Sequence, residues 1–223
     1  IGLGIPAEPL FRSDSVAPVV TSLTPGSGRR INGTVTITMS AQDNVAVDRS
    51  VLSVKNAEDT WEELASGEGE SCSYALDTTA YEDGVIEIRA MAYDRLENAS
   101  SGLTCQYEID NSGPQKVQNV TEKEHTSVTV TLRWDDVADE DISFYRVEEK
   151  LADGTWQKVG DTSSTLGLNI KDLTPECSYT YRVIGYDTLG NRGEPSEEIT
   201  VTTAVDIQTQ LLGNGTGNLN VHT

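Results

Sequence analysis

A set of landmarks that recurs about 95 residues apart constrains the fold of this chain most strongly. In each copy an aspartate stands four residues before a proline, a tryptophan follows a threonine, and a tyrosine-aspartate turn comes near the end. The matching segments are Asp14–Pro18 with Asp110–Pro114, Thr60–Glu62 with Thr155–Gln157, and Tyr93–Asn98 with Tyr186–Asn191. A chain of 223 residues has room for two domains of about 100 residues, so we predict two tandem copies of one architecture.

Within each copy, apolar residues alternate with polar ones, which is the period of a β-strand with one buried face. The predicted strands include Thr34–Met39, Val85–Met91, Val128–Trp134 and Tyr179–Val183. Turn pairs separate them at Asn32-Gly33, Asp83-Gly84, Asp153-Gly154 and Gly190-Asn191, and Asp153-Gly154 is typical of a hairpin. Short strands at this spacing, with no helical period, predict β-sandwiches.

The second copy resembles a fibronectin type III domain over residues 113–203. Trp134 stands where that family has its core tryptophan, and Tyr145-Arg146-Val147 resembles the third strand. Leu173–Tyr179 resembles the family's leucine-proline-tyrosine corner, which implies a tyrosine hydroxyl bonded to nearby backbone. Val201–Thr203 resembles the closing strand.

The first copy resembles bacterial immunoglobulin-like domains over residues 17–110. The resemblance rests on Pro25-Gly26, Asn32–Thr34, Asp43–Val47, Asp77–Thr79 with Tyr81, and Asp83-Gly84. Asp110–Pro114 resembles the joint that such modules share, and Glu97 departs from the family by replacing a turn glycine. Both families are non-catalytic and occur as arrays in adhesins, polysaccharide-degrading enzymes and toxin-like shells, which is the context that the resemblance implies.

The predicted fold class is therefore all-β, with two tandem immunoglobulin-like β-sandwiches of Greek-key topology joined by a short linker. We assign residues 1–14 to a leader or linker, 15–110 to the first sandwich, 111–203 to the second, and 204–223 to a tail or the start of a further segment. The chain has no run of 18 apolar residues and no secretory signal pattern at its start. We interpret it as a piece of a longer protein.

The chain carries 36 acidic against 16 basic residues, a net charge of −20. Such a charge repels phosphate backbones and anionic membrane surfaces, so we predict no nucleic-acid partner and no membrane insertion. The three cysteines, Cys72, Cys105 and Cys177, lack the short spacing of a zinc site. Cys72 and Cys105 fall in one module as buried free thiols or as one bridge, and we favour free thiols.

No arrangement of residues in the sequence predicts catalysis. The two histidines, His125 and His222, have no nucleophile or cysteine placed beside them in any recognisable motif. Paired carboxylates are frequent in so acidic a chain and carry little information. We therefore predict that the protein is not an enzyme and assign it no catalytic, cofactor or metal residues.

Structural calcium is an alternative that the acidic loops leave open, because Ca²⁺ prefers six to eight oxygen ligands. In the second module the loop 135–141, with Asp135, Asp136, Asp139, Glu140 and Asp141, and the turn Asp187–Asn191 would lie near Asp110 and Asn111 of the linker. The first module offers Asp14, Asp43, Asp48 and Asp94. Against calcium, an aspartate that opens a tight turn can accept backbone N–H bonds itself.

Two further binding signals are weaker. Trp61 and Trp156 could stack on carbohydrate, but their matching placement favours a shared packing role. Arg192-Gly193-Glu194 falls where some fibronectin modules display an integrin-binding tripeptide, yet its acid is glutamate and we interpret it as a turn. Four N-x-[ST] sequons begin at Asn32, Asn98, Asn119 and Asn214, and in a bacterial chain we expect them to stay unmodified.

The sequence thus predicts a non-catalytic spacer, presentation or interaction segment of a larger bacterial secreted or cell-surface protein. The expected partners are neighbouring domains of the same polypeptide and a host or cell-wall protein or glycan. The alternatives are an adhesion module that binds carbohydrate or protein, and an inter-domain rod stiffened by calcium.

Overall fold

The computed structural model describes residues 14–206, which fall into two compact β-units divided between Asn111 and Ser112. Each unit is described by itself. The predicted leader, apart from Asp14, and most of the predicted tail lie outside the described residues. Over residues 14–206 we find no helix long and apolar enough to cross a membrane.

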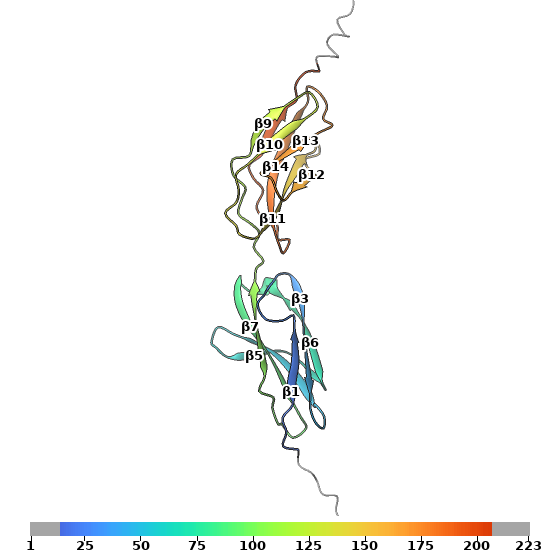
Figure 1. Ribbon diagram of the computed structural model, residues 1–223, viewed down its shortest axis with the longest axis vertical. Coiled ribbons are helices and arrows are strands. Elements are labelled where there is room, and N and C mark those ends of the chain that lie inside the picture. The colour runs from blue at the N-terminus through green and yellow to red at the C-terminus, as the bar shows by residue number, and fades with distance from the viewer. Residues whose placement is uncertain (1–13, 207–223) are drawn as a thin grey trace, which may run out of the picture. The chain divides into compact units, whose positions relative to one another are not determined.

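The first unit is a sandwich of a three-stranded and a five-stranded sheet, and Figure 1 labels several of its strands. The smaller sheet has the order β1-β3-β6, from Val19–Thr24, Thr34–Gln42 and Ser71–Asp77. The larger sheet has the order β2-β8-β7-β4-β5, from Arg29–Ile31, Leu103–Ile109, Gly84–Tyr93, Arg49–Lys55 and Trp61–Glu68. All pairs are antiparallel except β2 with β8, and a short 3-10 turn, η1 (Thr78–Ala80), follows β6.

The core of the first unit is built from the alternating residues of facing strands. Ile37 and Met39 of β3 are fully buried, as the alternation predicted, and they pack with Leu52 of β4 and Ile88 of β7. The polar residues between them face outward, which is the two-residue period of a strand with one buried face. Each strand thus contributes one apolar face to a closed core.

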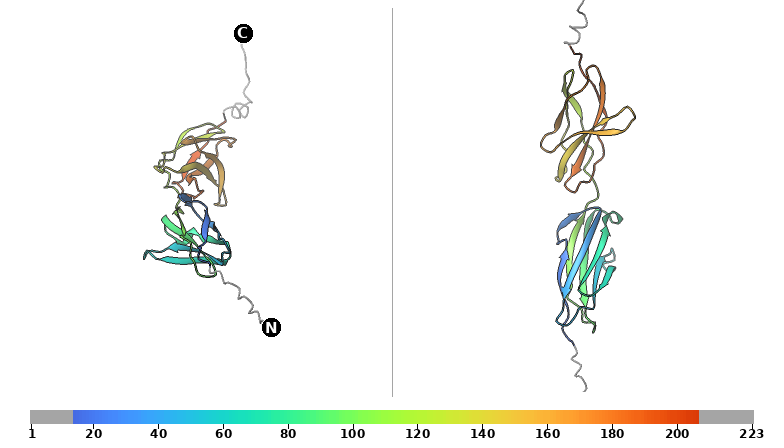
Figure 2. Two further views of the ribbon diagram at one scale, coloured as in Figure 1. Left: turned by 60° about the horizontal axis from the view of Figure 1, so that its bottom comes forward. Right: turned by 90° about the vertical axis from the view of Figure 1, so that its right-hand side faces the viewer.

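The second unit is also a two-sheet sandwich, seen from two further directions in Figure 2. One sheet has the order β13-β10-β9, from Gly167–Ile170, Val130–Arg133 and Thr121–His125. The other has the order β12-β11-β14-β15, from Trp156–Thr162, Ile142–Lys150, Ser178–Asp187 and Ile199–Thr202. The predicted hairpin at Asp153-Gly154 joins β11 to β12, and Gly154 adopts the left-handed φ of +86° that its turn requires.

Trp134 is buried at the centre of the second core, as the sequence predicted, with its ring tilted against Tyr145 at 5.8 Å between centroids. Val130 and Leu132 of β10 are fully buried beside it. The predicted strand that contains them starts two residues too early, because Val128 lies 45% exposed in a turn closed by hydrogen bonds between Thr126 and Thr129. Apolar alternation alone cannot locate a turn that side-chain hydroxyls stabilise.

A tyrosine hydroxyl makes a hydrogen bond to backbone in each sandwich. In the second unit the Tyr179 hydroxyl accepts a 2.8 Å hydrogen bond from the Thr174 backbone N–H, which confirms the predicted corner. In the first unit the Tyr107 hydroxyl donates to the Pro25 carbonyl at 2.6 Å, a bond that the sequence analysis did not foresee. The Tyr179 bond closes the connection that leads into β14, and the Tyr107 bond joins β8 to the segment that follows β1, 82 residues away in sequence.

In the second unit the Trp134 indole nitrogen and the Tyr181 hydroxyl are buried without a hydrogen-bond partner, and the Glu149 carboxyl is partly buried. Glu149 and Tyr181 are register partners on β11 and β14, and the Tyr181 hydroxyl is buried with no hydrogen-bond partner. Burial raises the pKa of the Glu149 carboxyl above its usual range. The Tyr181 hydroxyl lowers the stability of the folded state because it loses its hydration without gaining a partner, and partial burial disfavours the charged form of Glu149.

We expect Tyr179→Phe to destabilise the second unit by about 1 kcal/mol, because the Thr174 N–H loses its acceptor. Tyr181→Phe is the matched control: it deletes a hydroxyl that has no partner and should leave stability unchanged or raise it. Denaturant unfolding of the whole chain measures both. Equal losses in the two variants would contradict the corner bond.

Glu149→Gln should make the second unit more stable than the wild type at neutral pH. The folded pKa of Glu149 lies above its unfolded value, so its contribution to stability is largest in acid and declines as the pH rises above about 4.3. The gap between variant and wild type should therefore widen with pH in urea unfolding. Glu124→Gln, at an exposed position on β9, should show no such widening.

Candidate functional site

Asp94, one of the predicted calcium ligands, closes the tight turn that follows β7. Its Oδ1 accepts hydrogen bonds from the backbone N–H groups of Leu96 and Asn98 at 2.8 and 2.9 Å. The Asn98 side-chain amide donates to Asp94 Oδ2 at 2.7 Å and to the Asp14 carbonyl at 3.2 Å. Hydrogen bonding from the Asn98 side chain lowers the pKa of Asp94 and keeps the carboxylate charged.

Asp187 repeats this arrangement in the second unit. Its Oδ1 accepts from the N–H groups of Leu189 and Asn191 at 2.9 and 2.8 Å, and Asn191 donates to its Oδ2 at 2.8 Å. Both aspartates are almost completely buried. The repeated tyrosine-aspartate landmark is therefore a turn in which one carboxylate satisfies several backbone donors.

The turn of the first unit contains one conformational strain that its counterpart lacks. Glu97 has a left-handed φ of +62°, and the equivalent position in the second unit is Gly190 with a φ of +85°. This is the site where the sequence departs from the family's glycine. The Glu97 side chain pairs with Arg49 at 2.8 Å, which links the strained turn to β4.

The other predicted ligands of the first unit also engage protein groups. Asp43 Oδ2 accepts from the backbone N–H groups of Val45 and Ala46, while its Oδ1 is buried without a hydrogen-bond partner. Asp14 Oδ1 accepts from the Val16 N–H, and Asp48 forms an ion pair with Arg95 at 3.6 Å. These three carboxylates thus have local structural roles.

The acidic loop 135–141 of the second unit is likewise engaged by protein donors. Asp135 accepts from the Asn119 amide, Asp136 from the Tyr145 hydroxyl, and Asp139 from the Gln115 backbone N–H. At the end of the first unit, Asp110 pairs with Arg30, and Asn111 accepts from the Thr78 hydroxyl at 2.6 Å. Calcium at the linker stays a prediction.

Trp61 and Trp156, the candidate carbohydrate platforms, lie under cations from other strands of the same sheet. The guanidinium of Arg89 on β7 lies 4.3 Å from the Trp61 ring centroid. Arg182 on β14 lies 3.9 Å from the Trp156 centroid, and the Lys150 amine lies at 5.5 Å. A cation over the ring face is the packing role that the matched placement favoured.

The residues most often used for acid-base or nucleophilic chemistry are two histidines and three cysteines. His125 lies on β9 and contacts the neighbouring Glu122 at 2.5 Å, and His222 lies outside the described residues. Cys72, Cys105 and Cys177 are free thiols, as favoured from the sequence. Burial raises the pKa of Cys72, which disfavours the nucleophilic thiolate.

Within residues 14–206, the Arg192-Gly193-Glu194 tripeptide and two of the sequon asparagines have structural roles. Gly193 of Arg192-Gly193-Glu194 is buried, and its N–H donates to the Gly185 carbonyl at 2.9 Å. A Cβ at Gly193 would lie 2.4 Å from the Pro114 carbonyl oxygen, so this position requires glycine for packing. Of the sequon asparagines, Asn98 and Asn119 use their amides to bind Asp94 and Asp135, and Asn214 lies outside the described part.

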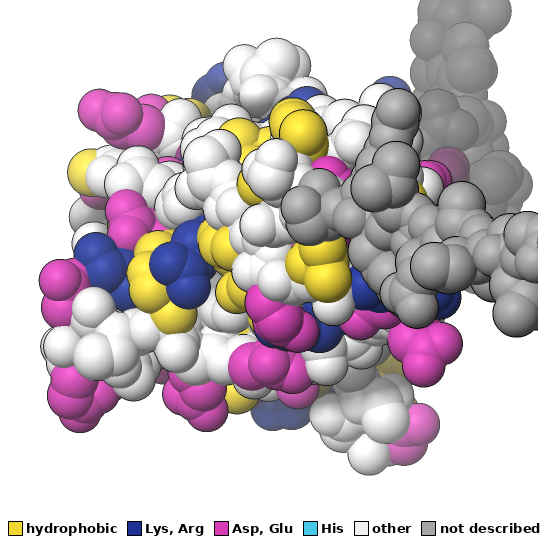
Figure 3. Space-filling view, turned by 90° about the horizontal axis from the view of Figure 1, so that it is seen from below, with side chains coloured by type: hydrophobic (Ala, Val, Ile, Leu, Met, Phe, Trp, Pro, Cys, Tyr) yellow, Lys and Arg dark blue, Asp and Glu magenta, His cyan; other side chains and the backbone are white. Residues whose placement is uncertain are grey.

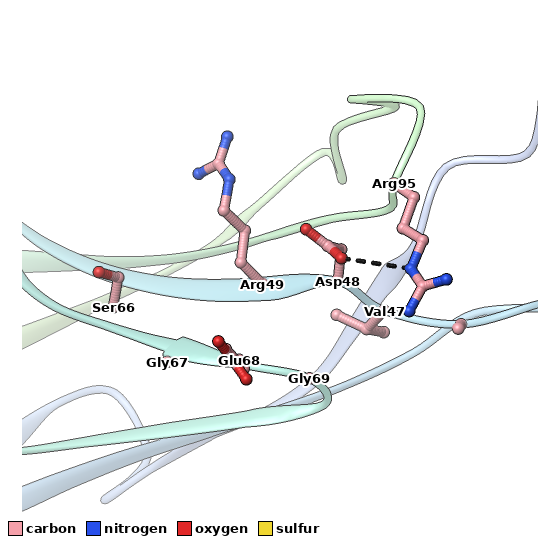
Figure 4. A pocket seen from close by; sticks show the side chains of 9 residues that line it. Val47, Asp48, Arg49, Ser66, Gly67, Glu68, Gly69 and Arg95 are labelled. Carbon is pink, nitrogen blue, oxygen red and sulfur yellow. Dashed lines mark ion pairs between the residues drawn. The ribbon is translucent and has the colours of Figure 1, made fainter.

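A shallow, polar cavity of about 700 Å³ lies in the first unit between β4, β5 and the turn after β7. Figure 4 shows Asp48 and Arg95 paired across its wall, with the Arg49 side chain directed away from Glu68. Seen from below, this end of the molecule interleaves acidic and basic side chains (Figure 3). The wall combines both charge signs and offers no nucleophile paired with a base.

Comparison with known proteins assigns both units. Residues 18–90 match the bacterial Ig domain, and residues 113–202 match the fibronectin type III domain. The chain is therefore a bacterial immunoglobulin-like domain followed by a fibronectin type III domain, as the resemblances predicted. Domains of these types are generally non-catalytic modules.

Receptor-type tyrosine-protein phosphatase F of Mus musculus is 38% identical over 82 residues, 36% of this chain and 4% of that protein. Its Danio rerio counterpart is 34% identical over 92 residues, 40% of this chain and 5% of that protein. The shared part is the fibronectin type III region alone. The chain thus spans only a small fraction of these relatives.

A solved structure of titin domains A168–A170 matches with a TM-score of 0.53 at 18% identity, over 85% of this chain and 67% of that one. At this identity the likeness supports the all-β fold and nothing further.

We expect Asp94→Asn to lower the melting temperature of the first unit at neutral pH, because the amide places a donor opposite the Asn98 side chain. The depressed pKa of Asp94 stabilises the fold above its unfolded pKa of about 3.9, and this contribution disappears as the pH falls through the folded value. The difference should therefore shrink in acid. Glu82→Gln, exposed in the same unit, should change little at any pH.

Proposed function

We propose that this chain is a non-catalytic spacer and presentation segment of a larger extracellular protein of bacterial origin. The observation that carries the proposal is that each unit closes its own core. The first core draws on residues 23–109 and the second on residues 117–201, with no residue in common. A module with a complete core can be joined to others without losing its own stability.

The local chemistry supports the same function. The acidic loops and turns that could have formed binding sites are engaged by backbone and side-chain donors of their own units. The bacterial Ig match supports the bacterial origin, and both domain types are typical of extracellular proteins. The partners that we propose are neighbouring domains of the same polypeptide and a host or cell-wall protein or glycan.

Calorimetric unfolding of the whole chain tests the spacer function, and we expect two separate transitions. Trp134→Ala should lower the stability of the second unit by about 3–5 kcal/mol, because it empties the centre of that core. Leu52→Ala, at a fully buried position of the first unit, is the reciprocal variant and should cost about 2–5 kcal/mol in the other transition.

The same calorimetric measurement is made with added calcium and with a chelator. Two transitions that respond to one variant each and ignore calcium would support independent spacer modules. A single transition lowered by both variants would contradict the division into independent units. A rise in the melting temperature of either transition on adding calcium would show that the ion binds the folded protein, and would contradict a passive spacer in favour of a rod stiffened by the ion.

A further inference from the structure

The outer face of the β12-β11-β14 sheet concentrates positive charge. Five of the nine Lys and Arg residues that follow residue 111 lie there or beside it, and we call them the cationic face: Arg146, Lys150, Lys158, Arg182 and Arg192. Eighteen acidic residues follow residue 111, so this clustering runs against the overall charge of the unit.

Strand register explains the cluster. Glu148 of β11 stands opposite Lys158 of β12 and opposite Arg182 of β14. Arg146 and Lys150 lie two residues before and after Glu148 on the same strand, so their side chains share its face. Four cations therefore surround one carboxylate, and adjacent strands about 4.8 Å apart keep them close together.

The carboxylates on the face do not balance its cations. Arg182 and Arg192 contact Glu148 at 2.7 and 3.5 Å. Arg146 and Lys158 both contact Asp161, and Lys150 contacts Glu198. Five cations thus share three carboxylates, which leaves an excess of positive charge. The side chains of Lys158, Arg192 and Lys150 are 53%, 40% and 39% exposed and remain accessible from solvent.

Aromatic rings hold two of the guanidinium groups in place. Arg146 lies over Tyr186 at 4.9 Å, and Tyr186 stacks on Phe144 with ring centroids 4.7 Å apart. Arg182 lies over Trp156. Fixed side chains lose little entropy when a partner binds, which favours affinity. Trp, Tyr and Arg are also the residues that contribute most at protein–protein interfaces.

We propose that the cationic face is a docking surface for an acidic protein surface. The excess positive charge selects an acidic partner, and the mixture of arginine with aromatic rings favours a protein over an anionic polysaccharide. At physiological ionic strength charges are screened beyond about 8 Å, so the face attracts a partner locally although the unit as a whole is acidic. This role goes beyond the spacer function and does not depend on it.

A synthetic oligo-glutamate peptide titrated into the full chain at low salt tests the proposal by NMR. We expect the backbone amide signals of β11, β12 and β14 to shift, and the binding to weaken as salt is added. The double variant Lys150→Glu with Lys158→Glu should reduce affinity roughly tenfold, since each exposed ion pair contributes up to about 1 kcal/mol.

The matched control is Lys123→Glu with Lys171→Glu, which changes the net charge equally at exposed positions away from the cationic face. Calorimetric unfolding of both double variants separates a loss of binding from a loss of folding. Equal affinity losses in the two double variants, or no shift on the three strands, would overturn the proposal. Dextran sulfate shifting these strands where oligo-glutamate does not would also overturn it, in favour of a polysaccharide partner. None of these outcomes alters the calorimetric test of the spacer function.

Discussion

The burial of one face of every strand is the constraint on which the rest of this structure depends. A strand of a sandwich has a single inner face, so the chain must pair sheets to remove its apolar residues from water. The buried residues separate into two sets, one around Ile37, Leu52 and Ile88 and the other around Trp134, Val147 and Val183. Turns, corners and surface ion pairs are arranged around these two cores.

Charged groups in this protein largely serve local structure. The two turn aspartates replace missing backbone acceptors, and their near-complete burial would be unfavourable without the several N–H donors that each one receives. The tryptophans at the hairpin ends lie beneath arginines that come from strands two positions away in the same sheet. Part of the acidic composition therefore consists of carboxylates that stabilise turns.

The two units use these devices in parallel but with different consequences. Glu97 occupies a left-handed position that Gly190 fills in the other unit, and its side chain pairs with Arg49. On the outer sheet face, the second unit gathers the five cations of the cationic face, while in the first unit Arg49 stacks on Tyr93. The two units thus share the same turn structure. Their exposed sheet faces differ, so one unit can acquire a separate role there.

The sequence by itself determined the all-β class, the tandem repeat and the inward position of Trp134, because alternation and spacing along the chain directly encode which residues face inward. The corner at Tyr179 was implied by the resemblance to the fibronectin type III domain. It also allowed two roles for Asp94 and Asp187, and the structure shows the backbone hydrogen bonds of the first role, while calcium stays a prediction. Only the tertiary structure decided that Tyr107 reaches Pro25, that Arg89 and Arg182 cover the tryptophans, and that four cations surround Glu148. These contacts join strands far apart in sequence, and they depend on strand order and register, which no local pattern specifies.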